Sequence, residues 1–203
     1  MIDFDSKARG WDADPRFIER GRRLAAAIRA RVALHGDLRA LDYGSGTGHL
    51  SFPLHDSVGR FTLVDSAAGM IEVAREKIAQ RGIANMEARH GDLNALRADE
   101  RFDLVCTAMA LHHIPDTDAA LAAFHDRLEA GGILCVADLD QEDGSFHGPE
   151  VEVHHGFDRK ELALRAERAG FTDVAFATVF EIEKETPAGM RSYPVFLMTA
   201  RRV

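Results

Sequence analysis

The chain has 203 residues, enough for one domain with a full hydrophobic core. Hydrophobic residues make up 46% and charged residues 29%, as in ordinary soluble globular proteins. The formal net charge of −8 argues against a nucleic-acid-binding protein, which normally presents a basic face. No apolar run has the length of a membrane span, and the first residues lack the apolar core of a signal peptide. Both cysteines, Cys106 and Cys135, lie in apolar runs and are expected to be reduced, as in a cytoplasmic protein.

Helical and strand-like periods alternate along the chain. Asp14 followed by Pro15 predicts a helix start, and apolar residues at helical spacing continue over 17–34. The other expected helices are 49–57, a helix from a Ser66 cap to Gly82, 116–128 ended by Gly131-Gly132, and 158–170 with a capping-box-like start at Asp158 and Glu161. The expected strands are 38–43, 61–64, 86–90, 102–108, 133–139, 174–182 and 195–200.

This alternation predicts an α/β fold with a doubly wound parallel sheet. Ligands of such folds bind at the carboxyl ends of the strands. The longest irregular stretch is 140–156, and a loop of that length in a compact domain is usually a lid or a binding loop. We expect it to line the site at which a substrate binds.

Three polar features follow three expected strands. The turn Gly44-Ser45-Gly46-Thr47-Gly48 comes after the first, Asp65 closes the second, and Gly91-Asp92 follow the third. Glycines let the backbone approach a ligand closely, and a carboxylate at the second strand can accept hydrogen bonds from ribose hydroxyls. The turn alone would also suit a tight strand-to-helix connection. The combination predicts a nucleoside cofactor.

A dinucleotide cofactor is the alternative. Its fingerprint G-x-G-x-x-G, begun at Gly44, requires a third glycine at the position that His49 occupies, and Gly48 comes one residue too early. An NAD-dependent oxidoreductase is therefore the less favoured interpretation.

Taken together, the motifs resemble those of class I S-adenosylmethionine-dependent methyltransferases of the small-molecule type (methyltransferase type 11/12-like). The similar segments occur in the order of that family and cover nearly the whole chain. They are LDYGSGTG at 41–48, VDSAAGM at 64–70, GDL at 91–93, FDLVCTAMALHHIPD at 102–116, LEAGGILCVADL at 128–139 and FDRKELALRAERAGF at 157–171.

The resemblance implies a Rossmann-like sheet of seven strands in the order 3-2-1-4-5-7-6. The seventh strand, 195–200, would be antiparallel and inserted beside the fifth. Residues 1–203 would form one domain, in which 1–34 provide a cap arm and a helix over the active site.

S-adenosylmethionine is the cofactor that the resemblance implies. Its methionine part would meet Asp42, the backbone of Gly44, Ser45 and Gly46, and the backbone of Ala108. Its adenosine part would meet Asp65 at both ribose hydroxyls, Ser66 beside it, Met70 and Leu93 at the ring, and Asp92 at the amino group.

The substrate side is less determined by the sequence. His112 could act as a base or steer a substrate, although a structural role for at least one histidine of the His112-His113 pair is the alternative. The other residues expected on this side are Trp11, His113, His147, His154 and His155. Trp11 could instead anchor the N-terminal arm to the core.

We expect no metal site. The acidic residues and histidines of 138–155 lack tight ligand spacing, and they also suit a solvated loop. Catechol-type methyltransferases place acidic metal ligands after the fourth strand, where this chain has Ala110-Leu111-His112-His113. The predicted function is methyl transfer to a small molecule by direct in-line displacement, with the acceptor atom (O, N, C or S) left open. The alternative from another class is a non-catalytic protein that binds the cofactor and regulates a partner.

Overall fold

The computed structural model describes residues 4–148, 150–187 and 189–203. Its helices are α1 (Phe4–Trp11), α2 (Pro15–Arg29), α3 (Ser51–Leu54), α4 (Ala68–Arg81), α5 (Thr117–Arg127) and α6 (Arg159–Arg168). Short 3-10 turns cover His55–Ser57, Leu93–Ala95 and Leu111–His113. The strands are β1 (Arg39–Tyr43), β2 (Arg60–Asp65), β3 (Met86–His90), β4 (Phe102–Ala108), β5 (Leu128–Leu139), β6 (Phe171–Thr186) and β7 (Gly189–Arg202).

All of these strands form one sheet in the order β3-β2-β1-β4-β5-β7-β6. The first five strands pair in parallel, and β7 is antiparallel to both β5 and β6. The expected fold, strand order and antiparallel seventh strand are confirmed. Parallel neighbours require helical crossovers, so every such strand ends at the same edge of the sheet.

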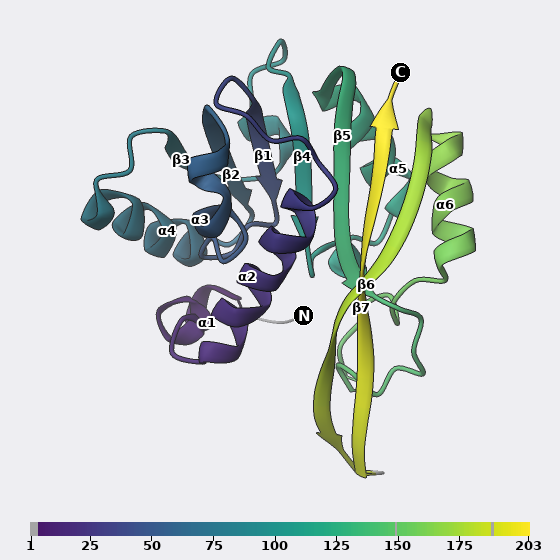
Figure 1. The fold of residues 1–203 in the computed structure, drawn as a ribbon. Helices are drawn as coiled ribbons and strands as arrows, with labels where there is room; N and C mark the ends of the chain where they lie inside the picture. The colour runs from purple at the N-terminus through teal and green to yellow at the C-terminus, as the bar shows by residue number, and fades with distance from the viewer. Residues whose placement is uncertain (1–3, 149, 188) are drawn as a thin grey trace.

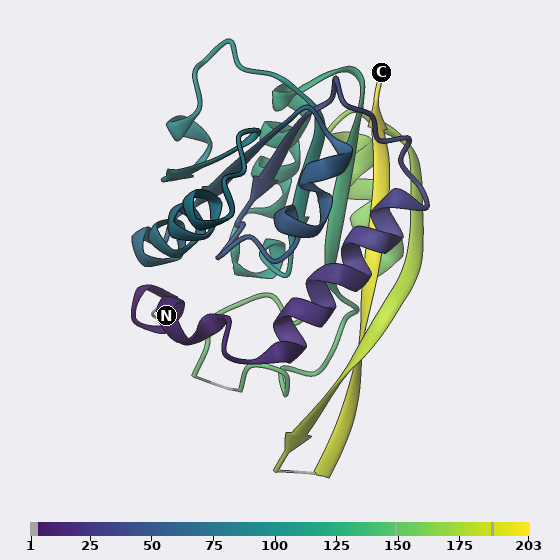
Figure 2. The same ribbon diagram turned by 60° about the vertical axis from the view of Figure 1, so that its left-hand side comes forward.

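Helices cover both faces of the sheet (Figures 1 and 2), and an apolar core lies between the sheet and the helices on each face. Successive side chains of a strand point to opposite faces. On β4, Leu104 and Cys106 therefore join the core under α2, α3 and α4, while Val105 joins the core under α5 and α6. This burial on both faces accounts for the continuous apolar run of β4 in the sequence.

The β6–β7 hairpin continues past the carboxyl edge of the sheet, and α1 lies at that same edge (Figure 1). The expected strands 174–182 and 195–200 cover only part of these long strands, because the outer hairpin residues are largely exposed and carry little apolar alternation. Within the described residues, none of the helices has the length and apolar character needed to cross a bilayer.

Several helix ends differ from the sequence expectations. Ser66 does not cap α4: the N-cap is Ala67, whose backbone N–H donates to Asp65 Oδ1 at 2.8 Å. The Asp65 carboxylate therefore accepts the hydrogen bond at the start of the helix. Ser66 lies one residue before the N-cap position. The expected end at Gly82 is confirmed, with the glycine in the left-handed region at φ 61°.

The other differences concern where α2, α3, α5 and α6 begin or end. Helix α5 ends at Arg127, and Gly131-Gly132 lie inside β5, where they accompany a register shift against β4. Asp158 caps α6 by accepting from the backbone N–H groups of Lys160 and Glu161, whereas the Glu161 carboxylate pairs with Arg165 rather than completing a capping box. The expected helix 49–57 is only α3 and a 3-10 turn, and α2 ends at Arg29 instead of residue 34.

Candidate active site

A cavity of about 570 Å³ opens at the carboxyl edge of the sheet. Its walls come from α1, the first half of α2, the glycine turn, the ends of β1, β2 and β4, the 140–156 loop and β6. The cavity thus joins the predicted cofactor turn to the predicted acceptor loop. Its volume is typical of a pocket for a small molecule or cofactor.

The glycine turn is held tightly against its neighbours. Gly44 has φ 67°, and a Cβ at this position would come within 2.5 Å of the Ala110 Cβ. The backbone N–H of Gly46 donates to Asp65 Oδ2 at 2.7 Å. Only glycine fits the first position, and the second links the turn directly to the end of β2.

Asp65 is fixed by two backbone donors. Gly46 donates to one carboxylate oxygen and Ala67 to the other, and the side chain lines the cavity. Burial raises the pKa of Asp65 in spite of these hydrogen bonds. Each oxygen retains a lone pair, so the carboxylate can accept further hydrogen bonds from a ligand.

Asp42 presents a buried acceptor that the described residues leave unpaired. Its side chain is 1% exposed; Ser51 Oγ–H donates to Oδ2, and Oδ1 has no hydrogen-bond partner among the residues described. Burial, with a smaller contribution from the charge of Asp65, raises the pKa of Asp42 to about 7. A buried carboxylate oxygen without a donor fits a cationic or hydrogen-bonding ligand group in the cavity.

The remaining cofactor candidates divide into two groups. Ser45, Ser66, Met70 and Ala108 line the cavity together with the residues above. Asp92 and Leu93 do not line it; Gly91 does, and the Asp92 side chain accepts from the backbone N–H of Asn94 at 2.7 Å.

Arg20 lines the cavity and is not among the site residues expected from the sequence. Its guanidinium lies over the Phe17 ring at 5.4 Å from the centroid, and burial lowers its pKa. Among the described residues it forms no ion pair. It stands on α2 next to Gly21, which packs against the His49 carbonyl. The sequence could have indicated this position of Arg20, because Arg20 lies on the same helical face as Phe17 and Leu24.

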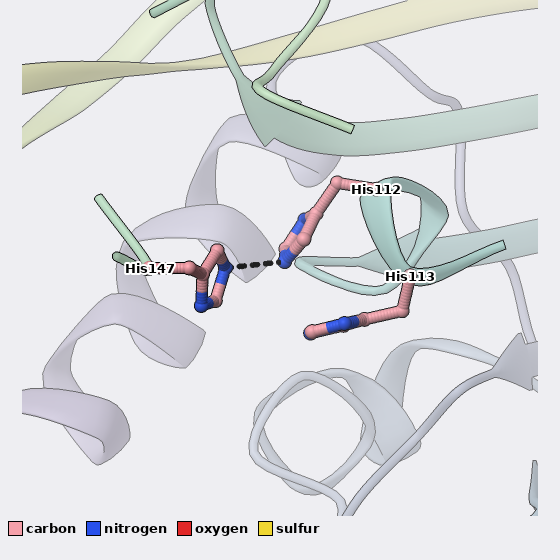
Figure 3. Close-up of side chains that lie close together, drawn as sticks. All are labelled: His112, His113 and His147. Carbon is pink, nitrogen blue, oxygen red and sulfur yellow. Dashed lines mark hydrogen bonds between the residues drawn. The ribbon is translucent and has the colours of Figure 1, made fainter. Parts of the chain in front are cut away.

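Three histidines gather at the other side of the cavity. His112 and His113 lie in the 3-10 turn after β4, and His147 lies in the 140–156 loop (Figure 3). The Nε2 atoms of His112 and His147 are 3.0 Å apart. The His112 ring also lies next to the His113 ring, with centroids 4.1 Å apart.

Asp138, at the end of β5, orients His112. Its Oδ1 accepts from His112 Nδ1 at 2.6 Å, and its Oδ2 accepts from the His112 backbone N–H at 3.1 Å. Both side chains are almost completely buried, at 0% and 1% exposure. A neutral His112 therefore carries its proton on Nδ1 and directs the lone pair of Nε2 toward His147.

His113 and His147 are neutral at pH 7. Burial lowers the pKa of each to about 4, and the repulsion that a second protonated histidine would exert in the cluster adds to this shift. His113 contacts the ring of Phe4 edge-on, and none of the described residues hydrogen-bonds to its ring nitrogens. His113 is thus a half-buried imidazole with two unpaired nitrogens.

Trp11 lines the cavity and stacks on Phe17, with ring centroids 4.6 Å apart and an interplanar angle of 5°. It therefore joins α1 to α2 and also faces the pocket. Both positions expected from the sequence, an anchor of the N-terminal arm and a residue at the pocket, describe Trp11.

His154 and His155 lie outside the residues that line this cavity. His154 Nε2 donates to the Ile114 carbonyl oxygen at 3.0 Å, and the His155 ring lies against Gly144. The structure therefore corrects the expected grouping: of the three loop histidines, only His147 reaches the cavity. The backbone of 140–156 folds back on itself through hydrogen bonds such as Glu142 N to His155 O, which turns 154 and 155 away.

The structure also adds Phe146 to the wall of the pocket and Asp138 behind it. An aspartate inside the apolar run of β5 was the available signal for Asp138, because a buried carboxylate requires donors. Nothing in the sequence near Phe146 marks its role.

A known family matches this arrangement. The sequence profile of the family described as "Methyltransferase domain" matches residues 34–153, more than half of the chain. The chain belongs to the methyltransferase-domain family. The resemblance inferred from the motifs is therefore confirmed, and the matched segment includes the glycine turn, Asp65, the histidine pair and Asp138.

Curated relatives match just over half of the chain. The ubiquinone/menaquinone biosynthesis C-methyltransferase UbiE of Xanthomonas campestris is 31% identical over 121 residues, which are 57% of this chain and 48% of that protein. Aklanonic acid methyltransferase DauC of a Streptomyces species is 38% identical over 112 residues, 53% of this chain and 51% of that protein. The match thus spans about half the length of these relatives.

Among solved structures, a SAM-dependent methyltransferase from Aquifex aeolicus superimposes with a TM-score of 0.74. It is 22% identical, and the match covers 100% of both chains. This likeness supports the fold.

Proposed function

We propose that this chain transfers a methyl group from S-adenosylmethionine to a small-molecule acceptor. The observation that supports this proposal most is the polar edge of the cavity. There the glycine turn and the carboxylate of Asp65 meet the buried Asp42 oxygen that has no partner in the described parts of the chain. These groups suit a ligand with a cationic amino acid at one end and a ribose at the other. Membership in the methyltransferase-domain family supports the same cofactor.

In this proposal Asp42 and the backbone of the glycine turn hold the methionine part of the cofactor. Asp65 accepts hydrogen bonds from the ribose hydroxyls, and Met70 packs on the adenine. Arg20 adds a partly desolvated cation for the methionine carboxylate. The cofactor supplies an electrophilic methyl group; the protein aligns the acceptor with it and excludes water.

A small-molecule acceptor is supported by the size of the cavity and by its apolar wall, which includes Trp11 and Phe146. The acceptor attacks the methyl carbon in line, the S–CH₃ bond breaks, and the electron pair of that bond stays on sulfur. We propose His112, oriented by Asp138, as the residue that activates the acceptor. We place the acceptor beside the 140–156 loop because Phe146 and His147 of this loop line the cavity.

Calorimetry with S-adenosylmethionine, S-adenosylhomocysteine and NAD tests the cofactor. We expect binding of the first two and none of the third. Tight NAD binding without S-adenosylmethionine binding would refute the proposal.

Asp65→Ala should weaken S-adenosylmethionine binding by about 1–3 kcal/mol, because charge-assisted hydrogen bonds to the ribose are lost. The matched control is Asp37→Ala, at a fully exposed carboxylate far from the cavity. Equal affinity of both variants for the cofactor would contradict the role of Asp65.

The alternative function is a non-catalytic cofactor-binding protein. A screen of small metabolites for methylated products, with wild-type protein and His112→Ala in parallel, separates the two. We expect the wild type to form a product and His112→Ala to form much less of it while binding the cofactor equally well. Cofactor binding with no product from any pool would favour the regulatory alternative.

A further inference from the structure

We propose that His112, His113 and His147 form a binding site for a divalent transition-metal ion of the zinc class, facing the acceptor side of the cavity. The sequence spacing predicts no metal because the three histidines come from segments about 35 residues apart. The fold assembles them. The binding site stands on its own geometry, while its role in activating the acceptor rests on the proposed methyl transfer.

The three imidazoles are close enough to share one ion. One nitrogen from each lies within 4.8 Å of the others, and the Nε2 atoms of His112 and His147 are 3.0 Å apart (Figure 3). Bonds of about 2.0–2.1 Å to zinc place cis or tetrahedral nitrogens roughly 3.0–3.4 Å apart. The His112–His147 pair already has this spacing. The His113 nitrogen lies within 4.8 Å of the other two, so we expect its side chain to shift toward them when an ion binds.

Asp138 gives the cluster the outer hydrogen bond that metal-binding histidines require. It accepts from His112 Nδ1 at 2.6 Å and is completely buried. This bond leaves Nε2 unprotonated and aimed at the cluster. A carboxylate behind an imidazole also raises the basicity of the ligand nitrogen.

The other two histidines are suited to be ligands. Both are partly buried and line the cavity beside His112. A purely structural role explains His147, whose Nε2–H can donate to His112. It does not explain His113, whose ring nitrogens have no partner within the described part of the chain.

Three histidine ligands leave further coordination positions open toward the cavity. Imidazole nitrogens suit Zn²⁺, Co²⁺, Ni²⁺ and Cu²⁺ more than Mg²⁺ or Ca²⁺. A hydroxyl acceptor bound at an open position would lose its proton to solvent more readily. Its oxygen would then attack the methyl carbon, and the sulfonium would leave as the thioether. His112 would activate the acceptor through the ion.

The test is a titration of the chelator-treated, untagged protein with Zn²⁺ in a calorimeter, repeated with Co²⁺ while visible absorption is recorded. We expect one ion per chain and the absorption bands of Co²⁺ in a nitrogen-rich site. His113→Ala and His147→Ala should each weaken Zn²⁺ binding by about tenfold or more, and Asp138→Asn by about 10–100-fold. His35→Ala, at an exposed histidine far from the cluster, is the matched control and should bind Zn²⁺ as the wild type does.

Absence of Zn²⁺ binding, or equal affinity in His113→Ala, His147→Ala and the wild type, would overturn the proposal. Circular dichroism checks that each variant is folded; His113 and His147 are only half-buried, so their removal should leave the fold intact. S-adenosylmethionine binding is measured in the same samples. Cofactor binding without Zn²⁺ binding would refute the metal site alone, and the reverse result would refute the proposed methyl transfer alone.

Discussion

Asp42 and Asp65 differ in the hydrogen bonds that they accept from the chain, although both lie near the carboxyl ends of neighbouring strands. Asp65 receives a backbone donor on each oxygen, whereas Asp42, among the residues that the structure describes, receives a donor from Ser51 alone, on one oxygen. The pKa of Asp42 is about 7, because burial penalises its charged form. Its folded pKa is thus above its unfolded value. The contribution of Asp42 to the free energy of unfolding is therefore full below about pH 4 and declines as pH rises toward 7.

This linkage predicts proton release when the cofactor binds. A cationic amino group beside Asp42 stabilises the carboxylate and lowers its pKa, so at pH 6 binding of S-adenosylmethionine should release up to about one proton. Calorimetry in buffers of different ionisation enthalpy measures this number.

Asp42→Asn at the same pH is the control, since it keeps the shape of the side chain and removes its titration. The difference in proton release between the two proteins gives the contribution of Asp42, separate from any proton that the amino group of the cofactor itself releases. If both release the same number of protons, Asp42 does not face the cationic group.

The N-terminal arm is an element tied to the glycine turn by one carboxylate. Asp12, just after α1, accepts from Thr47 Oγ1, from His49 Nε2 and from Lys77 Nζ, each at 2.6 Å. Burial alone would raise the pKa of Asp12, but these three hydrogen bonds outweigh it and hold the pKa well below its usual range. The network closes α1 over the cavity, which Phe4 and Trp11 line.

Asp12→Asn should loosen this arm. The charged hydrogen bonds contribute about 1–2 kcal/mol after allowance for partial exposure, equivalent to a roughly 5–30-fold change in arm opening. We expect faster dissociation of the cofactor in stopped-flow measurements, with Asp37→Asn as an exposed control. Because the folded pKa of Asp12 is depressed, wild-type protein should lose the same contribution as pH falls below about 4. Unchanged dissociation would show that the arm does not limit release.

At the scale of the whole molecule, one sheet is shared by two cores, so neither core can unfold without exposing the other face of the same strands. We infer that residues 1–203 behave as a single domain. Every adjacent pair in the order β3-β2-β1-β4-β5-β7-β6 is hydrogen-bonded, from one edge of the sheet to the other.

Phe124→Ala, in α5 on one face, should lower the free energy of unfolding by about 3–5 kcal/mol, because it leaves a cavity in a fully buried position. If the chain is one cooperative unit, hydrogen exchange of the slowest amides should accelerate equally in β2 and in β7. Leu164→Ala, at an exposed leucine of α6, should change stability by less than about 0.5 kcal/mol. Acceleration confined to one part of the sheet would indicate separate folding units.

The sequence by itself determined the alternation of elements, and with it the doubly wound sheet and the edge of the sheet at which the cavity opens. Periodicity, caps such as Asp14 and Asp158, and the left-handed glycine at 82 are local signals that act through a few neighbouring residues. Such signals give the wrong helix boundary where a neighbouring side chain can make the same hydrogen bond. At the start of α4, Asp65 rather than Ser66 accepts the hydrogen bond.

Only the tertiary structure decided which side chains meet. His147 approaches His112 across 35 positions of sequence, and His154, seven residues further on, is turned to the Ile114 carbonyl instead. Such choices depend on hydrogen bonds and packing between distant segments, which have no periodic trace in the sequence. The glycine turn, Asp42 and Asp65 reach the cavity through local turns, so their place in its wall could be anticipated from sequence, whereas Asp92 and Leu93 do not line it. The histidine cluster depends on the path of one long loop and could not be anticipated.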